Sequence, residues 1–129
     1  MLRRDMGLIR KNLEVAGSIS RRACNVLFDT GASACFVRED VARELSQVLK
    51  SPTPLAFTLG DETVIRTENL TVLYVNIKDH LLFHHFLIVP KLPSEVVIGA
   101  DFLQRWKIKL DPSTEEFIID EKALEIILV

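Results

Sequence analysis

The segment 26–33 holds the residues of this sequence with the clearest potential for chemistry. An apolar strand delivers Asp29 into a turn, where Thr30 and Gly31 follow at once. A carboxylate held at such a turn can act as a general acid or base. An aspartate at the end of a strand is also common without a catalytic role, because its side chain caps backbone amides. Asp29-Thr30-Gly31 taken alone therefore leaves both interpretations open.

A second segment, residues 97–99, is informative only in combination with the first. Val97, Ile98 and Gly99 again place two apolar residues before a turn former, and a helical stretch follows. Taken alone, they are more simply a buried strand that ends where a helix begins. Between the two segments lie two long strands and a hairpin with Gly60 and Asp61 at its polar tip. The order of these segments is more informative than any one of them.

The hydrophobic pattern predicts the elements that must position these residues. Its period is mostly two, so we expect a mainly β domain. The expected strands are residues 13–20, 24–28, 35–37, 55–59, 63–66, 70–77, 81–89, 95–98, 108–110, 117–119 and 124–129. Residues 20–23 are expected to form the first turn. Two short helices are expected, over 41–49 with Asp40 as N-cap and over 100–106.

Length and composition limit the class of protein. The 129 residues are 48% hydrophobic and 26% charged, which fits one globular domain over 1–129. Within it we expect a flexible start at 1–7 and a C-terminal extension over 118–129 that contributes to a dimer interface. The apolar runs are far shorter than the roughly 20 residues of a membrane span, and the start is not a secretory signal. Two cysteines favour reduced thiols and a cytoplasmic location.

Charge is balanced overall but not along the chain. A net charge of -2 argues against a nucleic-acid partner, which would normally require a basic excess. Residues 1–22 nevertheless carry six basic and two acidic residues, and residues 111–129 carry six acidic residues and one lysine. The two ends are therefore opposite in sign and would attract each other if an interface brought them together.

In order and spacing, these segments resemble the retroviral-type (retropepsin-like) aspartic proteases. Residues 28–33 look like the catalytic loop of that family, 55–66 like its flap hairpin, and 97–103 like its hydrophobic-hydrophobic-glycine segment with the helix after it. The resemblance covers roughly residues 8–117. It implies the acid protease fold, a closed β-barrel with one or two short helices and half of an active site in each chain.

The resemblance implies an aspartic endopeptidase in which Asp29 is the catalytic residue. Such an enzyme needs two carboxylates that face one water, and the sequence holds one Asp-Thr-Gly. A homodimer supplies the second Asp29 by two-fold symmetry. The two carboxylates share one proton, so one activates the water while the other donates to the scissile carbonyl of a polypeptide. This chemistry requires no metal and no cofactor.

Other residues receive supporting roles from the same resemblance. Thr30 would hydrogen-bond across the pair of loops, and Gly31 would bring backbone N–H groups near the carboxylates. Ala32 and Ser33 complete the loop, and Val97, Ile98 and Gly99 pack behind it. The flap would close over an extended peptide through Phe57, Leu59, Gly60 and Asp61.

Ala32 matches the retroviral branch of the family. In the pepsin-like branch this position is commonly Ser or Thr, whose hydroxyl donates to the catalytic carboxylate and favours its ionised form. Ala32 has no hydroxyl to donate. We therefore expect a mildly acidic rather than a strongly acidic working pH.

Three alternatives remain beside this interpretation. His80, His84 and His85 suggest a metal site, but neighbouring strand residues point to opposite faces, and no cysteine or carboxylate completes a ligand pattern. Cys24 lies inside a strand, so we expect a core residue rather than a nucleophile. A non-catalytic, protease-like dimer that binds peptides or mediates assembly is the alternative function.

Overall fold

The structure is a computed structural model that describes residues 8–58 and 63–128. Its strands are β1 (Leu8–Ala16), β2 (Arg21–Asp29), β3 (Phe36–Arg38), β4 (Leu49–Thr58), β5 (Val64–Ile77), β6 (His80–Val89), β7 (Val96–Ile98), β8 (Ile108–Asp111) and β9 (Glu116–Ile119). Its helices are α1 (Glu39–Leu45), α2 (Ala100–Arg105) and α3 (Glu121–Leu128). Helix α1 and strand β4 divide the stretch predicted as one helix over 41–49.

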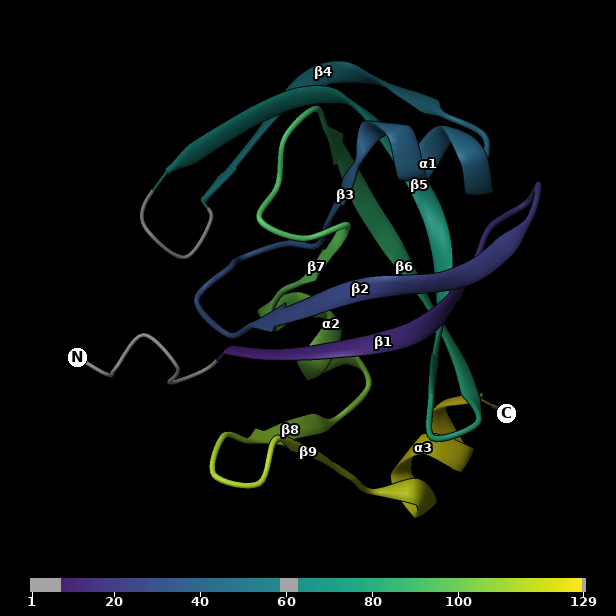
Figure 1. The fold of residues 1–129 in the computed structure, drawn as a ribbon, viewed down its shortest axis with the longest axis vertical. Helices are drawn as coiled ribbons and strands as arrows, with labels where there is room; N and C mark the ends of the chain where they lie inside the picture. Colours follow the sequence, from purple (N-terminus) through teal and green to yellow (C-terminus); the bar gives the residue numbers. More distant parts are fainter. Residues whose placement is uncertain (1–7, 59–62, 129) are drawn as a thin grey trace.

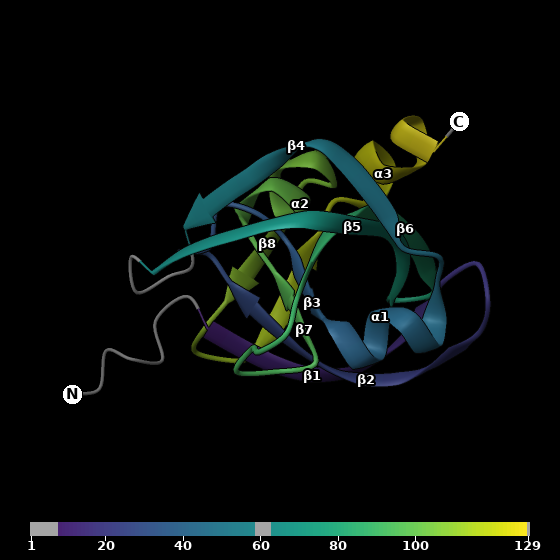
Figure 2. The ribbon, with the colours of Figure 1, turned by 90° about the horizontal axis from the view of Figure 1, so that it is seen from above.

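Six of the described strands form a closed barrel in the order β1-β2-β7-β3-β6-β5. Val15 on β1 pairs with Val75 on β5 and closes the ring. The barrel is mixed, because β2–β7 and β3–β6 are parallel while the other pairs are antiparallel. Strand β4 continues the sheet beyond β5, and the two strands arch together over one end of the molecule (Figures 1 and 2). The predicted mainly β, retropepsin-like barrel is confirmed.

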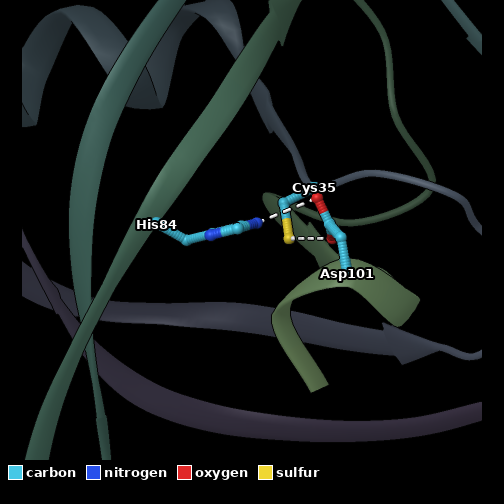
Figure 3. A group of neighbouring side chains, drawn as sticks. All are labelled: Cys35, His84 and Asp101. Atoms are coloured by element: carbon cyan, nitrogen blue, oxygen red, sulfur yellow. Dashed lines mark hydrogen bonds and ion pairs between the residues drawn. The ribbon is translucent and has the colours of Figure 1, made fainter. Parts of the chain in front are cut away.

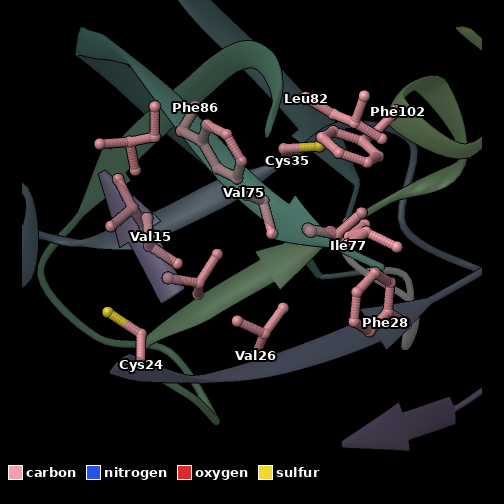
Figure 4. Close-up of a cluster of buried hydrophobic side chains, with 14 of the residues drawn as sticks. Val15, Cys24, Val26, Phe28, Cys35, Val75, Ile77, Leu82, Phe86 and Phe102 are labelled. Atoms are coloured by element: carbon pink, nitrogen blue, oxygen red, sulfur yellow. The ribbon is translucent and has the colours of Figure 1, made fainter. Parts of the chain in front are cut away.

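The barrel interior is filled by aliphatic and aromatic side chains (Figure 4). Phe28, Phe86 and Phe102 have no exposed surface, and Trp106 on the segment after α2 is 1% exposed. Burial of each such side chain stabilises the fold by about 1.5–3 kcal/mol. A second apolar cluster, which includes Ala32, Phe36 and Val97, lies beside the first. The barrel therefore provides a rigid base for the loops that leave it.

The first turn lies earlier in the chain than the sequence predicted. It spans residues 17–20 rather than 20–23, and the Gly17 N–H donates to the carbonyl of Ser20 across it at 2.9 Å. Ile19 and Ser20 donate their N–H groups to the carbonyl of Leu45, at 2.9 and 3.1 Å. Contact with the end of α1 thus fixes this turn, and alternation along one strand could not reveal that contact.

The predicted N-cap of α1 is wrong. Asp40 lies inside the helix, and Arg38 occupies the N-cap position without a side-chain hydrogen bond to the helix. The Asp40 carboxylate instead accepts a 2.7 Å hydrogen bond from the Arg38 guanidinium Nε. That hydrogen bond lowers the pKa of Asp40.

The last strand predicted from the sequence is also wrong, because residues 121–128 form helix α3. Asp120, just before the helix, is its N-cap, since its carboxylate accepts a 3.1 Å hydrogen bond from the N–H of Ala123. Leu124 is fully buried and joins the main core cluster. The capping aspartate and this one buried leucine on the first turn dock the helix on the barrel.

Candidate active site

Asp29 is the last residue of β2, at the point where the barrel strand becomes a turn. The N–H of Gly31 donates to Asp29 Oδ1 at 2.9 Å, and the N–H of Ala32 donates to the main-chain carbonyl of Asp29 at 3.0 Å. Thr30 and Gly31 are exposed, Asp29 is half-buried, and Ala32 is buried. The loop therefore holds the carboxylate in a fixed orientation at the surface of the chain.

Strand β7 supports this loop from behind. It lies between β2 and β3, with Ile98 opposite Phe28 and Val97 paired with both Leu27 and Phe36. Val97, Ile98 and Gly99 are all buried. The structure thus places the three residues of the second predicted segment directly behind the loop that carries Asp29.

Gly99 sits at the closest approach between these two segments. A Cβ at this position would lie 2.2 Å from the carbonyl oxygen of Ala34 and 2.7 Å from that of Ala32. Just beyond it, the N–H of Ala100 donates to the Ala32 carbonyl at 2.9 Å. Gly99 therefore allows the start of α2 to pack against the backbone of the loop.

The β4–β5 hairpin reaches the loop from the other side. Ser33 donates to the carbonyl of Thr58, through its N–H at 3.3 Å and through its hydroxyl at 3.2 Å. Phe57 pairs with Ile65 across the hairpin and packs partly buried against the second apolar cluster. Leu59, Gly60 and Asp61 lie outside the described residues. The structure thus brings the described end of β4 next to the Asp29 loop.

A cavity of about 830 Å³ opens beside Thr30, between the loop, α2 and β8. Leu103, Ile108 and Leu110 contribute apolar side chains to its lining. The apolar lining thus lies next to the exposed part of the Asp29 loop.

The structure also forms a polar cluster that sequence reasoning missed, made of Cys35, His84 and Asp101 (Figure 3). The Cys35 thiol donates to Asp101 Oδ1 at 3.3 Å, and His84 Nε2 lies 2.9 Å from Asp101 Oδ2. No ligand pattern around the histidines was visible in the sequence, yet the fold brings a cysteine and a carboxylate next to His84. The His84 side chain is mostly buried, at 15% exposed.

The electrostatics of this cluster follow from its burial. Burial and the nearby Asp101 charge raise the pKa of the Cys35 thiol well above its ordinary value. For Asp101, burial would raise the pKa, but interactions with His84, Cys35 and the Phe102 N–H together lower it. The three residues come from β6, from α2 and from the segment before β3, so no short spacing in the sequence announces them. Pairing of Phe36 with Leu87, which brings these segments together, is a feature of the barrel.

The remaining chemical candidates have structural roles. Cys24 is 1% exposed inside β2, as predicted for a core residue, and burial raises the pKa of its thiol to about 11. Both cysteines are free. His80 lies 3.2 Å from Glu121 at the start of α3. Across residues 8–58 and 63–128, no helix has the length and apolarity to cross a membrane.

A closed mixed barrel with an Asp-Thr-Gly loop at the end of one strand and an apolar-apolar-Gly strand behind it defines the retropepsin-like class. The comparison with protein families agrees. The model described as "gag-polyprotein putative aspartyl protease" matches residues 15–105, which include both segments. The chain belongs to this family of aspartyl proteases. Among curated proteins, the comparison finds no match.

Proposed function

We propose that the protein is a homodimeric aspartic endopeptidase in which each chain contributes one Asp29. One observation carries the proposal: the sequence holds a single Asp-Thr-Gly, and its Asp29 ends β2. A second carboxylate must therefore come from a second copy. A two-fold axis beside Asp29 would place the two side chains together.

The surface around Asp29 supports such an arrangement. Thr30 and Gly31 are exposed, although their neighbour Ala32 is buried, so the part of the loop that would meet a second loop is free in the single chain. The cavity beside Thr30 adds apolar lining from α2 and β8 to the same side. A second copy can cover both features.

The chemistry follows from two carboxylates in close contact. Ionisation of both carboxylates would place two negative charges in contact, which is unfavourable in free energy, so the pair shares one proton. The ionised carboxylate removes a proton from a bound water, and that water attacks the peptide carbonyl. The protonated carboxylate donates to the carbonyl oxygen and stabilises the tetrahedral intermediate. No metal and no cofactor enter this reaction.

The β4–β5 hairpin is proposed as the flap that holds the substrate. Its described end is fixed to the Asp29 loop by the hydrogen bonds between Ser33 and Thr58. An extended polypeptide between hairpin and loop would gain strand-like hydrogen bonds. Phe57, Leu59, Gly60 and Asp61 are the proposed contacts, of which Phe57 lies among the described residues. Cytoplasmic location stays a prediction.

Cleavage of a diverse peptide mixture, read by mass spectrometry over a range of pH, tests the proposal. Wild type should cut internal peptide bonds, and Asp29→Asn should abolish cleavage while the chain stays folded. Asp79→Asn is the matched control, because Asp79 lies in the β5–β6 turn with φ 70°, a conformation that Asn adopts readily. Peptide binding without cleavage in wild type, unchanged by Asp29→Asn, would indicate the non-catalytic peptide-binding dimer instead.

A further inference from the structure

We propose that Cys35, His84 and Asp101 form a binding site for one zinc-class divalent metal ion. One ligand atom from each residue, a sulfur, a nitrogen and an oxygen, lies within 4.8 Å of the other two. Ligands about 2.0–2.3 Å from a tetrahedral zinc ion are roughly 3.3–3.8 Å apart. Small side-chain movements therefore convert the observed cluster into a coordination shell.

The donor set selects the metal. Thiolate, imidazole and carboxylate are the ligands of zinc sites, whereas calcium and magnesium take oxygen ligands almost entirely. Three protein ligands leave one coordination position free. His84, Cys35 and Asp101 all line a cavity of about 570 Å³. This cavity supplies a route for the ion and room for a water molecule at the fourth position.

Neighbouring backbone groups already hold two of the ligands. The N–H of Gly99 points at Cys35 Sγ at 3.5 Å, and the N–H of Phe102 donates to Asp101 Oδ1 at 2.7 Å. Hydrogen bonds of this kind orient metal ligands and stabilise a thiolate. Cys35 has no solvent-exposed surface, so these backbone groups and the cavity are the surroundings of its side chain that the site would use.

The hydrogen-bond order argues against a nucleophilic cysteine in the same place. A cysteine nucleophile needs a histidine that accepts the thiol proton. Here Asp101 lies between the two groups, because it accepts from Cys35 on one oxygen and contacts His84 on the other. Metal binding uses the three side chains without that order. The thiol releases one proton as the sulfur–metal bond forms, and neutral His84 coordinates through Nε2.

A bound ion would join three elements behind the Asp29 loop. His84 lies on β6, Asp101 on α2, and Cys35 on the segment that connects the loop to β3. Because Gly99 and Ala100 contact the same loop, the ion would strengthen the support of that loop. An ion that binds the folded chain alone must raise its thermal stability.

Cobalt titration of the untagged, metal-free full chain tests the site. We expect one Co²⁺ per chain, with a thiolate-to-cobalt charge-transfer band and the visible bands of tetrahedral cobalt, and displacement of both by Zn²⁺. Cys35→Ser should remove the charge-transfer band, and His84→Gln and Asp101→Asn should each weaken binding at least tenfold. Zn²⁺ should raise the unfolding temperature of wild type and not that of Cys35→Ser.

Cys24→Ser and His85→Gln are the matched controls, since Cys24 is the other buried thiol and His85 lines the same cavity outside the cluster. Both should keep the band and the affinity. If Cys35→Ser fails to fold, His84→Gln carries the test, because this side chain is partly exposed. A folded wild type without the charge-transfer band, or a band that Cys24→Ser rather than Cys35→Ser removes, would overturn the proposal. Since no readout uses peptide cleavage, this result is independent of the protease test.

Discussion

Ala32 and Ser33 decide which donors reach the Asp29 carboxylate. Ala32 has no side-chain donor, and its N–H is directed to the Asp29 main-chain carbonyl. The Ser33 hydroxyl donates to Thr58 instead of Asp29. The carboxylate thus receives the Gly31 N–H but not the Ser33 hydroxyl.

A mildly acidic working pH follows for the proposed dyad. Without a hydroxyl donor from Ala32 or Ser33 to its charged form, the pair should hold its shared proton to a higher pH than the pepsin dyad. Ala32→Ser should extend the acidic limb of the kcat/KM profile to lower pH, because the new donor favours ionisation. Ser33→Ala, which removes a hydroxyl already bound to Thr58, is the control and should leave that limb in place. A wild-type optimum near pH 2 would defeat this argument.

At the scale of single residues, local motifs were predictable and long-range clusters were not. The turn at Asp29, Thr30 and Gly31 could be predicted because its residues are consecutive in the sequence. The contact of Gly99 with the same loop could be expected from the family pattern. The Cys35–His84–Asp101 cluster depends on the parallel pairing of β3 with β6, which no local period encodes.

At the scale of elements, the junction of β7 and α2 is the least tolerant part of the site. Gly99→Ala places a Cβ against the backbone oxygens of Ala34 and Ala32, which cannot rotate away. We expect destabilisation of at least about 1–3 kcal/mol and loss of activity with it. Ala100→Ser, one residue further on and half-buried beside the cavity, should be tolerated. Equal urea midpoints for Gly99→Ala and wild type would contradict the packing described here.

Glu95 ties β7 to β2 through a pH-dependent contact. The backbone N–H of Asn25 donates to Glu95 at 2.8 Å and lowers the pKa of this carboxyl, as does the Arg22 guanidinium at 3.0 Å. Because the folded-state pKa lies below the unfolded one, this stabilisation is present at neutral pH and is lost as pH falls through the folded-state value.

Glu95→Gln should therefore destabilise the protein by about 1–2 kcal/mol at pH 7. The difference from wild type should shrink in acid, as the pH falls through the lowered folded-state pKa and the wild-type carboxyl protonates too. Urea unfolding at fixed protein concentration, from pH 7 into the acid range, measures this difference in unfolding free energy. Glu44→Gln, which alters an exposed partner of Arg22, should cost less than about 0.5 kcal/mol. A Glu95→Gln effect that is constant with pH would rule out the charge as its cause.

The C-terminal helix shows where pattern reasoning fails at this scale. Leu124 and the apolar residues after it resemble a strand because the run is short, and short apolar runs fit either period. Asp120 as N-cap and the docking of Leu124 in the core resolve the ambiguity toward α3. The barrel strands were easier to predict, because long alternating runs such as 70–77 fit one period.

At the scale of the whole molecule, one pair of opposite charges from the two ends already lies close together within one chain. Lys11 on β1 lies 4.0 Å from Glu116 on β9. This contact belongs to the folded chain, so it needs no partner. The proposed dimer rests instead on the need for a second Asp29.

Mixing of wild-type and Asp29→Asn chains tests that need most directly. After exchange of subunits, heterodimers hold one competent carboxylate and should be inactive. A threefold excess of Asp29→Asn should therefore leave about a quarter of the activity of the same amount of wild type, if the chains pair at random. In the control, the same threefold excess of Asp79→Asn chains is mixed with wild type. This excess should not inhibit cleavage. Cleavage that is unaffected by any excess of Asp29→Asn, and that stays constant per chain on dilution, would contradict the shared active site.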